Sequence, residues 1–161
     1  IDPKGVFIVD SPIDLAALYK SSEKNIERNF SEPSIQESTW LLETLGNNFG
    51  NPKDSIGKYE KNAVFTYSTN NTSNLKKLKR TKIRLYTEPD TLWWKENRMA
   101  DYGQMNAFYI KKLSESLTQK GYESVEYIPT TDKGYRANGE RHPHSWSIVD
   151  KKDLINWILN K

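Results

Sequence analysis

Two residues that could form a proton relay follow two successive predicted strands. Asp90 lies just beyond the segment 82–87, and His144 lies in the loop after the segment 124–128. A carboxylate can hold an imidazole in one tautomer, and that imidazole can take and return a proton near neutral pH. In open α/β sheets such groups gather at the carboxyl ends of parallel strands. We therefore expect Asp90 and His144 to form a site at that edge of a sheet.

Other residues could fill either role. His142 competes with His144, because these are the two histidines of the chain. Glu88 and Asp101 compete with Asp90, because the segment between Asp90 and Asp101 is longer than a loop at this place needs to be. Asp90 could instead only cap the turn that follows it. The sequence leaves these alternatives open.

Four further residues have both a functional and a structural interpretation. Trp93 and Trp94 could line an acyl or aromatic substrate pocket, or they could simply pack. Asp10 and Asp14 resemble a split carboxylate pair for a metal ion. A strand end and a helix N-terminus explain both carboxylates without an ion. We therefore expect no metal and no cofactor.

The elements that must position these residues alternate between strand and helix. An apolar run without alternation at 5–10 predicts a strand buried on both faces. Ser11 as cap and Pro12 at the first helical position predict a helix directly after it. Further helices are expected at 33–45, over the periodic segment 105–117, and after a cap at Asp150, and further strands at 82–87 and 124–128. The segment 47–80 is expected to be mostly loop, with a helical turn after Ser55 and an extended piece at 64–67.

This order of elements is that of βαβ units, which form parallel sheets with right-handed connections. The predicted fold class is α/β, a three-layer arrangement with a parallel sheet of about three strands and flanking helices. The strand at 5–10 would expose an apolar edge, which invites pairing with more chain. We expect a further segment to lie beside it.

Composition narrows the classes of protein. The chain has 161 residues, a formal charge of +3 and no cysteine, so disulfides and thiolate sites are absent from it. Its 5 Trp, 9 Tyr and 5 Phe argue against disorder. The net charge is too small to indicate nucleic acid as a partner. No apolar run approaches the ~20 residues of a membrane-spanning helix.

The placement of Asp90 and His144 resembles the C-terminal half of an α/β-hydrolase, the superfamily of esterases and lipases. In that family the acid follows the penultimate strand and the histidine follows the last one. The segment 144–146, His-Ser-Trp, is similar to the His-x-Trp of many esterase-like members. The resemblance implies one partial hydrolase domain over 1–161, with a variable cap or loop region at about 22–81. Residues 82–161 would then carry the catalytic acid and histidine.

The family's nucleophile elbow, Gly-x-Ser-x-Gly, does not occur in the chain. The resemblance therefore implies a serine-dependent acyl (ester) hydrolase that is inactive without its N-terminal half. That half would be the partner, as a separate fragment or a removed segment, and a small ester-like molecule would be the substrate. The alternatives are a non-catalytic ligand-binding module that uses exposed aromatics, and a degenerate hydrolase-fold scaffold.

The first residue and two short motifs bear on the location of the protein. The first residue is Ile1 rather than methionine, so we expect a processed or truncated N-terminus. Two stretches, 29–31 and 70–73, match the glycosylation acceptor pattern. Together these features favour a secreted or periplasmic location.

Overall fold

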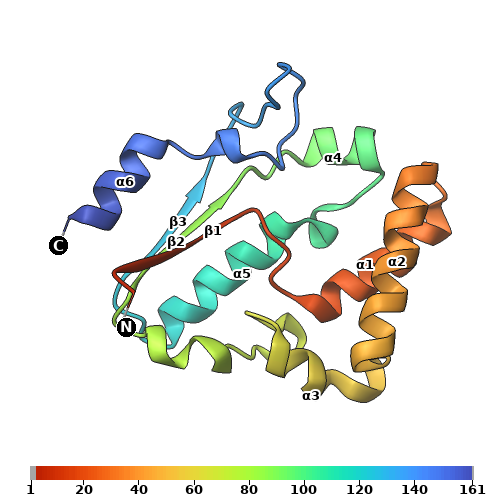
Figure 1. Ribbon diagram of the computed structural model, residues 1–161, viewed down its shortest axis with the longest axis horizontal. Coiled ribbons are helices and arrows are strands. Elements are labelled where there is room, and N and C mark those ends of the chain that lie inside the picture. The colour runs from red at the N-terminus through yellow and green to blue at the C-terminus, as the bar shows by residue number, and fades with distance from the viewer. Residues whose placement is uncertain (1–2, 161) are drawn as a thin grey trace.

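A parallel sheet of three strands lies at the centre of the computed structural model, which describes residues 3–160 (Figure 1). The strands are β1 (Gly5–Val9), β2 (Lys82–Thr87) and β3 (Val125–Pro129), in the order β1-β2-β3. Both pairings are parallel, with Ile8 opposite Leu85 and Leu85 opposite Tyr127. All three carboxyl ends therefore lie at one edge of the sheet.

Helices cover both faces of the sheet, as expected (Figure 1). α5 (Asn106–Gln119) packs on one face, where Ile83 and Leu85 of β2 join its buried leucine and isoleucine side chains. α6 (Lys151–Leu159) packs on the other face, where Trp157 meets Tyr86. Alternate side chains of β2 thus enter two separate cores. The predicted three-layer arrangement of a parallel sheet and flanking helices is confirmed.

The connection from β1 to β2 is largely helical. It contains α1 (Leu15–Arg28), α2 (Glu32–Phe49) and α3 (Pro52–Asn62), packed around a small core of their own. Two 3₁₀ segments follow, Tyr67–Thr69 and Ser73–Leu78. These three helices lie at the end of the molecule opposite α6 (Figure 1).

The prediction that 47–80 is mostly loop was wrong. Asn51 caps α3 by accepting a hydrogen bond from the Lys53 amide, and Pro52 opens the helix. Tyr59 is fully buried, but most other α3 side chains are polar and exposed. Because this helix buries so few residues, its sequence lacks the regular spacing of apolar residues by which a helix is predicted.

The start of α1 also differs from the expectation. Asp14, not Ser11, is the cap: its backbone is extended and its Oδ1 accepts from the Ala17 amide at 2.9 Å. The Ser11 hydroxyl instead donates to the Val9 carbonyl. The chain therefore leaves β1 through a short extended segment before the helix begins.

The segment after β2, expected as a long loop, forms α4 (Thr91–Arg98). Asp90 caps it, with Oδ1 accepting from the Trp93 amide at 3.0 Å. Asp150 caps α6 in the predicted way.

β1 pairs with β2 on one side, and within residues 3–160 no strand pairs with its other side. Phe7 is 37% exposed on this strand and makes an edge-to-face contact with Trp146, which is 62% exposed. Large aromatic rings are therefore exposed beside the open edge.

None of the helices within residues 3–160 is both long and apolar enough to span a bilayer.

Candidate active site

His144 is hydrogen-bonded to a carboxylate, and that carboxylate belongs to Asp10. The distance from His144 Nδ1 to Asp10 Oδ2 is 2.8 Å. Asp10 follows β1 directly, and His144 lies in the loop between β3 and α6, residues 130–145, which we call the histidine loop. Both residues therefore come from the carboxyl-terminal edge of the sheet, where open α/β sheets place their sites.

Asp10 is held rigidly at the end of β1. Its amide donates to the Tyr86 carbonyl, and its carbonyl accepts from the Asn106 side chain at 2.7 Å. The buried Thr87 hydroxyl donates to Oδ1 at 2.8 Å, which leaves Oδ2 for the histidine. The backbone of Asp10 has φ of 39°, in the left-handed region that Asp and Asn tolerate better than most residues. Only 4% of Asp10 is exposed, so its orientation is fixed by protein contacts.

The environment of His144 favours its protonated form. The hydrogen bond to Asp10 raises the pKa of His144, burial opposes this rise, and the negative charge of Asp10 adds to it. Because Nδ1 faces the carboxylate, it carries a proton in the neutral tautomer, and Nε2 is the basic nitrogen. Within residues 3–160, no hydrogen bond involves Nε2. The ring is thus poised to accept a proton at Nε2.

His142, the competing histidine, has no carboxylate partner among the described residues. Its Nδ1 lies 3.1 Å from the His144 carbonyl oxygen, and its ring packs against Trp93. Burial, and next the charge of Arg136, lower the pKa of His142. The geometry therefore distinguishes the two histidines and supports His144 as the proton acceptor.

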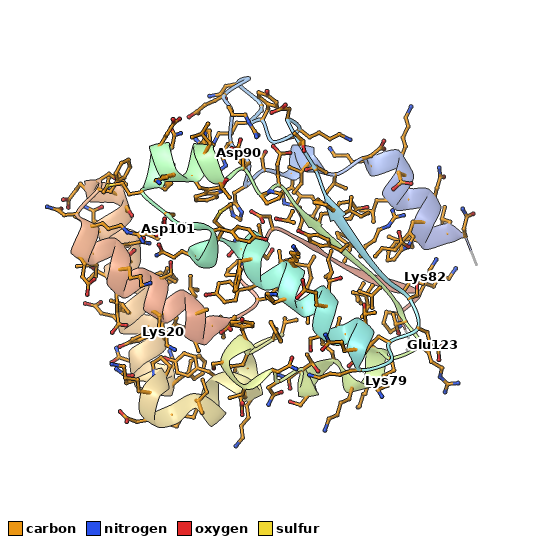
Figure 2. All side chains as sticks on the ribbon, turned by 180° about the vertical axis from the view of Figure 1, so that it is seen from behind. Lys20, Lys79, Lys82, Asp90, Asp101 and Glu123 are labelled. Atoms are coloured by element: carbon orange, nitrogen blue, oxygen red, sulfur yellow. The ribbon has the colours of Figure 1, made fainter. Side chains whose placement is uncertain are left out.

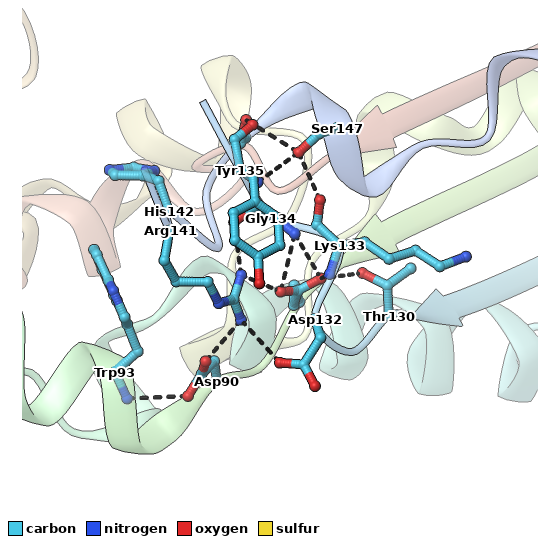
Figure 3. Close-up of polar contacts among 12 residues, drawn as sticks. Asp90, Trp93, Thr130, Asp132, Lys133, Gly134, Tyr135, Arg141, His142 and Ser147 are labelled. Atoms are coloured by element: carbon cyan, nitrogen blue, oxygen red, sulfur yellow. Dashed lines mark hydrogen bonds and ion pairs between the residues drawn. The ribbon is translucent and has the colours of Figure 1, made fainter. Parts of the chain in front are cut away.

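The structure does not bring Asp90 and His144 together. Asp90 Oδ2 accepts from Arg141 Nη2 at 2.7 Å, while its Oδ1 caps α4 (Figure 3). Both oxygens are therefore engaged, and a guanidinium outcompetes an imidazole as partner because it is always charged and presents several donors. In this structure Asp90 links α4 to the histidine loop, and Asp10, at the end of β1, makes the contact with His144 that was expected of Asp90.

Glu88, the second alternative for the acid, is instead an anchor for the histidine loop. Its buried carboxylate accepts from the Thr130 hydroxyl and from the amides of Lys133 and Gly134. It also pairs with Arg141 at 2.5 Å. Burial alone would raise the pKa of Glu88, but these donors lower it below its ordinary value. Figure 3 shows how these contacts, with those of Asp90, converge on the loop.

The loop packs most tightly at Gly134. A Cβ placed there would lie 2.6 Å from Pro143 Cα and 2.7 Å from the His142 carbonyl oxygen, both backbone atoms that cannot move aside separately. We expect Gly134→Ala to lower the free energy of unfolding by about 1–3 kcal/mol, as other overpacked sites do. Urea denaturation measures this loss. Gly103→Ala is the matched control, because a Cβ at Gly103 meets nothing within 4 Å, and an equal loss in both variants would contradict the packing argument.

The remaining sequence candidates lie outside the pair. Asp101 is exposed, and within residues 3–160 no hydrogen bond or ion pair joins it to a histidine. Figure 2 shows Asp90 and Asp101 at the end of the molecule opposite Lys82 and Glu123. Asp14 uses both oxygens for backbone amides, those of Ala17 and Tyr67. In the described part of the chain, no three His, Cys, Asp or Glu side chains are grouped to hold a metal ion.

A cleft of about 610 Å³ opens beside the histidines. Its walls come from α1, the start of α2, α4, the segment 100–106 and the histidine loop. Trp94 lines it, and Trp93 is not among its lining residues. Trp93 contacts the rings of Trp94 and His142. A smaller recess of about 130 Å³, between Asp10 and Trp146, reaches His144 from the side of β1.

Comparison with known proteins adds no name to this site. No protein-family model, no curated protein and no solved structure matches the chain.

The contact between Asp10 and His144 was not predicted, because the two interpretations of Asp10 were a metal ligand and a residue of the strand end. The parallel strand order places the end of β1 next to the end of β2, so Asp10 was available from the sequence as an acid for His144. Arg141 lies in no sequence motif that would have indicated its ion pair with Asp90.

Proposed function

We propose that the chain is the C-terminal portion of a serine-dependent acyl hydrolase and supplies the acid and the base of its triad. The observation that carries the proposal is the hydrogen bond of 2.8 Å between His144 Nδ1 and Asp10 Oδ2 at the carboxyl-terminal edge of a parallel sheet. A buried, oriented carboxylate behind an imidazole whose other nitrogen is free is the arrangement that activates a serine hydroxyl.

The chemistry divides into two transfers. As a serine Oγ attacks the ester carbonyl carbon, its proton passes to Nε2 of His144, and Asp10 stabilises the imidazolium that forms. The same proton then goes to the oxygen of the departing alcohol as the acyl–oxygen bond breaks. In the second transfer, His144 takes a proton from water as the water oxygen attacks the acyl carbon. It returns that proton to the serine Oγ as the bond between the acyl carbon and Oγ breaks, which releases the acid.

The serine and the oxyanion donors must come from a partner, because the chain lacks the Gly-x-Ser-x-Gly turn. The free edge of β1, where Phe7 and Trp146 are exposed, supports a further parallel strand beside it. The recess between Asp10 and Trp146 is lined by residues 9–11 at the end of β1 and reaches His144. We propose that the N-terminal half of the hydrolase docks on this edge and presents its serine there.

Reconstitution tests this function. The chain alone is expected to leave p-nitrophenyl acetate unhydrolysed, and the natural polypeptide or complex that includes both halves is expected to hydrolyse it. His144→Ala in that complete protein should reduce turnover to near background, while His142→Ala should retain most of it. Turnover that survives His144→Ala would overturn the proposal.

The pH dependence provides a separate prediction. His144 must be neutral to accept a proton, and its pKa is raised above 6.5 by Asp10, so the acidic limb of kcat/KM should lie above pH 6.5. His142→Gln should leave this limb in place. Asp10→Asn should move the limb of the residual activity to lower pH, because the main cause of the raised pKa is removed. A limb that shifts with His142 but not with Asp10 would contradict the assignment.

A non-catalytic binding module remains the second candidate function. The cleft favours it, because its walls belong entirely to this chain and include Trp94. Such a module would bind its ligand with no hydrolysis in the complete protein. The reconstitution experiment separates the two functions.

A further inference from the structure

The cleft beside the histidines has the size of a small-molecule site. Its volume of about 610 Å³ falls within the ~300–1,000 Å³ typical of ligand pockets. It lies between the α1–α2 hairpin on one side and α4 with the histidine loop on the other, and His144 forms part of its wall. A molecule held there would place one end against the proposed base.

The walls are unusually polar for such a site. Ligand pockets are mostly lined by apolar and aromatic side chains. Here the hairpin contributes Ser21, Asn25, Ser34 and Glu37. Within residues 3–160, the side chains of Ser21, Ser34 and Glu37 make no hydrogen bond or ion pair, so their donors and acceptors are free for a ligand. A long acyl chain would cover these groups without offering them hydrogen-bond partners, which is unfavourable.

The charges in the cleft are of both signs and do not favour an ionic ligand. Arg136 is paired with Glu140, and Arg98 lies over the ring of Trp93. Glu37 contributes a negative charge on the opposite wall. A carboxylate accepts hydrogen bonds and a guanidinium donates them, so together they suit hydroxyl groups, which do both.

Trp94 is the aromatic member of the wall. The face of an indole carries partial negative charge, to which C–H groups are attracted. A sugar ring combines a face of C–H groups with a rim of hydroxyls. It could therefore contact Trp94 through its face and the serines, Asn25 and Glu37 through its rim.

We infer that the cleft binds the sugar part of an acylated carbohydrate, so that the ester bond lies at His144. The ester part of this inference rests on the proposed hydrolase function. Sugar binding itself does not, because every residue that carries it lies in this chain.

Binding is measured on the chain with a panel of glucose, galactose, mannose, xylose and their β-1,4-linked disaccharides, by saturation-transfer NMR. At least one sugar is expected to bind. Trp94→Ala should weaken that binding roughly tenfold, the loss expected for one aromatic contact. Trp40→Ala, which removes a tryptophan of α2 that is 61% exposed and outside the cleft, should leave it unchanged. Glu37→Gln should also weaken binding, and Glu43→Gln on the same helix should not.

The outcomes separate this inference from the hydrolase function. Sugar binding with no ester hydrolysis by the complete protein would overturn the hydrolase function and leave sugar recognition standing. Hydrolysis of p-nitrophenyl octanoate without binding of any sugar in the panel would overturn the inference and leave the hydrolase function. Sugar binding that Trp94→Ala and Glu37→Gln do not weaken would place the sugar elsewhere and also overturn it.

Discussion

Asp10→Asn is expected to lower kcat for ester hydrolysis by roughly 10⁴ in the complete protein, the loss seen when a triad acid is replaced by its amide. The carbonyl oxygen of the substituted side chain can still accept from Thr87, and asparagine tolerates the left-handed backbone at this position. The new amide group would face Nδ1 of His144 as a donor. The imidazole must then accept at Nδ1 and carry its proton at Nε2, which is the wrong tautomer for a base.

The matched control is Asp90→Asn. Asparagine is as good a helix cap as aspartate, so the start of α4 is preserved. The change removes one partly exposed ion pair with Arg141 and no contact of His144. Initial rates with p-nitrophenyl acetate should therefore fall by less than tenfold. A collapse of activity in Asp90→Asn together with normal activity in Asp10→Asn would restore Asp90 as the acid.

Glu88→Gln is expected to lower the free energy of unfolding by about 3–5 kcal/mol, as removal of one partner from a buried ion pair does. The Gln side chain cannot accept from all the donors that surround Glu88, so Arg141 would keep Asp90 but lose its buried partner, and an amide of Lys133 or Gly134 would lose its acceptor. Urea denaturation measures the loss. Glu123→Gln, at an exposed position, should change the stability by less than about 0.5 kcal/mol, as surface changes usually do.

Acid titration gives a second readout for Glu88. Because its pKa is lower in the folded chain than the ordinary 4.5, its contribution to stability is present above pH 4.5 and is lost as the pH falls through the folded value. Glu88→Gln should therefore flatten the loss of stability in acid. An unchanged acid profile would mean that Glu88 does not carry the anchoring role.

The sequence predicts the strands and the packed helices well because their burial leaves a clear pattern. The β-rich runs at 5–9 and 82–87 lie in the middle layer, and the period of 105–117 reflects the face of α5 buried on the sheet. α3 and α4 were not predicted because they bury few side chains. Their caps, Asn51 and Asp90, were the available signals.

The sequence predicted His144 and an acid at the carboxyl-terminal edge of the sheet, and the structure places His144 there in contact with Asp10 rather than Asp90. The choice of acid could not follow from distance along the chain. It depends on which carboxylates Arg141 engages, and Arg141 binds Glu88 and Asp90, leaving Asp10 for the histidine. Such a competition is settled by packing of the histidine loop, which no local pattern encodes.

The most direct measurement of the central claim is the rate at which a fluorophosphonate probe labels the complete protein. A probe of this kind reacts with a serine only when a base activates the hydroxyl. We predict rapid labelling of one serine outside this chain, much slower labelling in Asp10→Asn, and an unchanged rate in Asp90→Asn. Absence of labelling in the complete protein, or a rate insensitive to Asp10, would contradict the claim that Asp10 and His144 form the acid–base pair of a serine hydrolase.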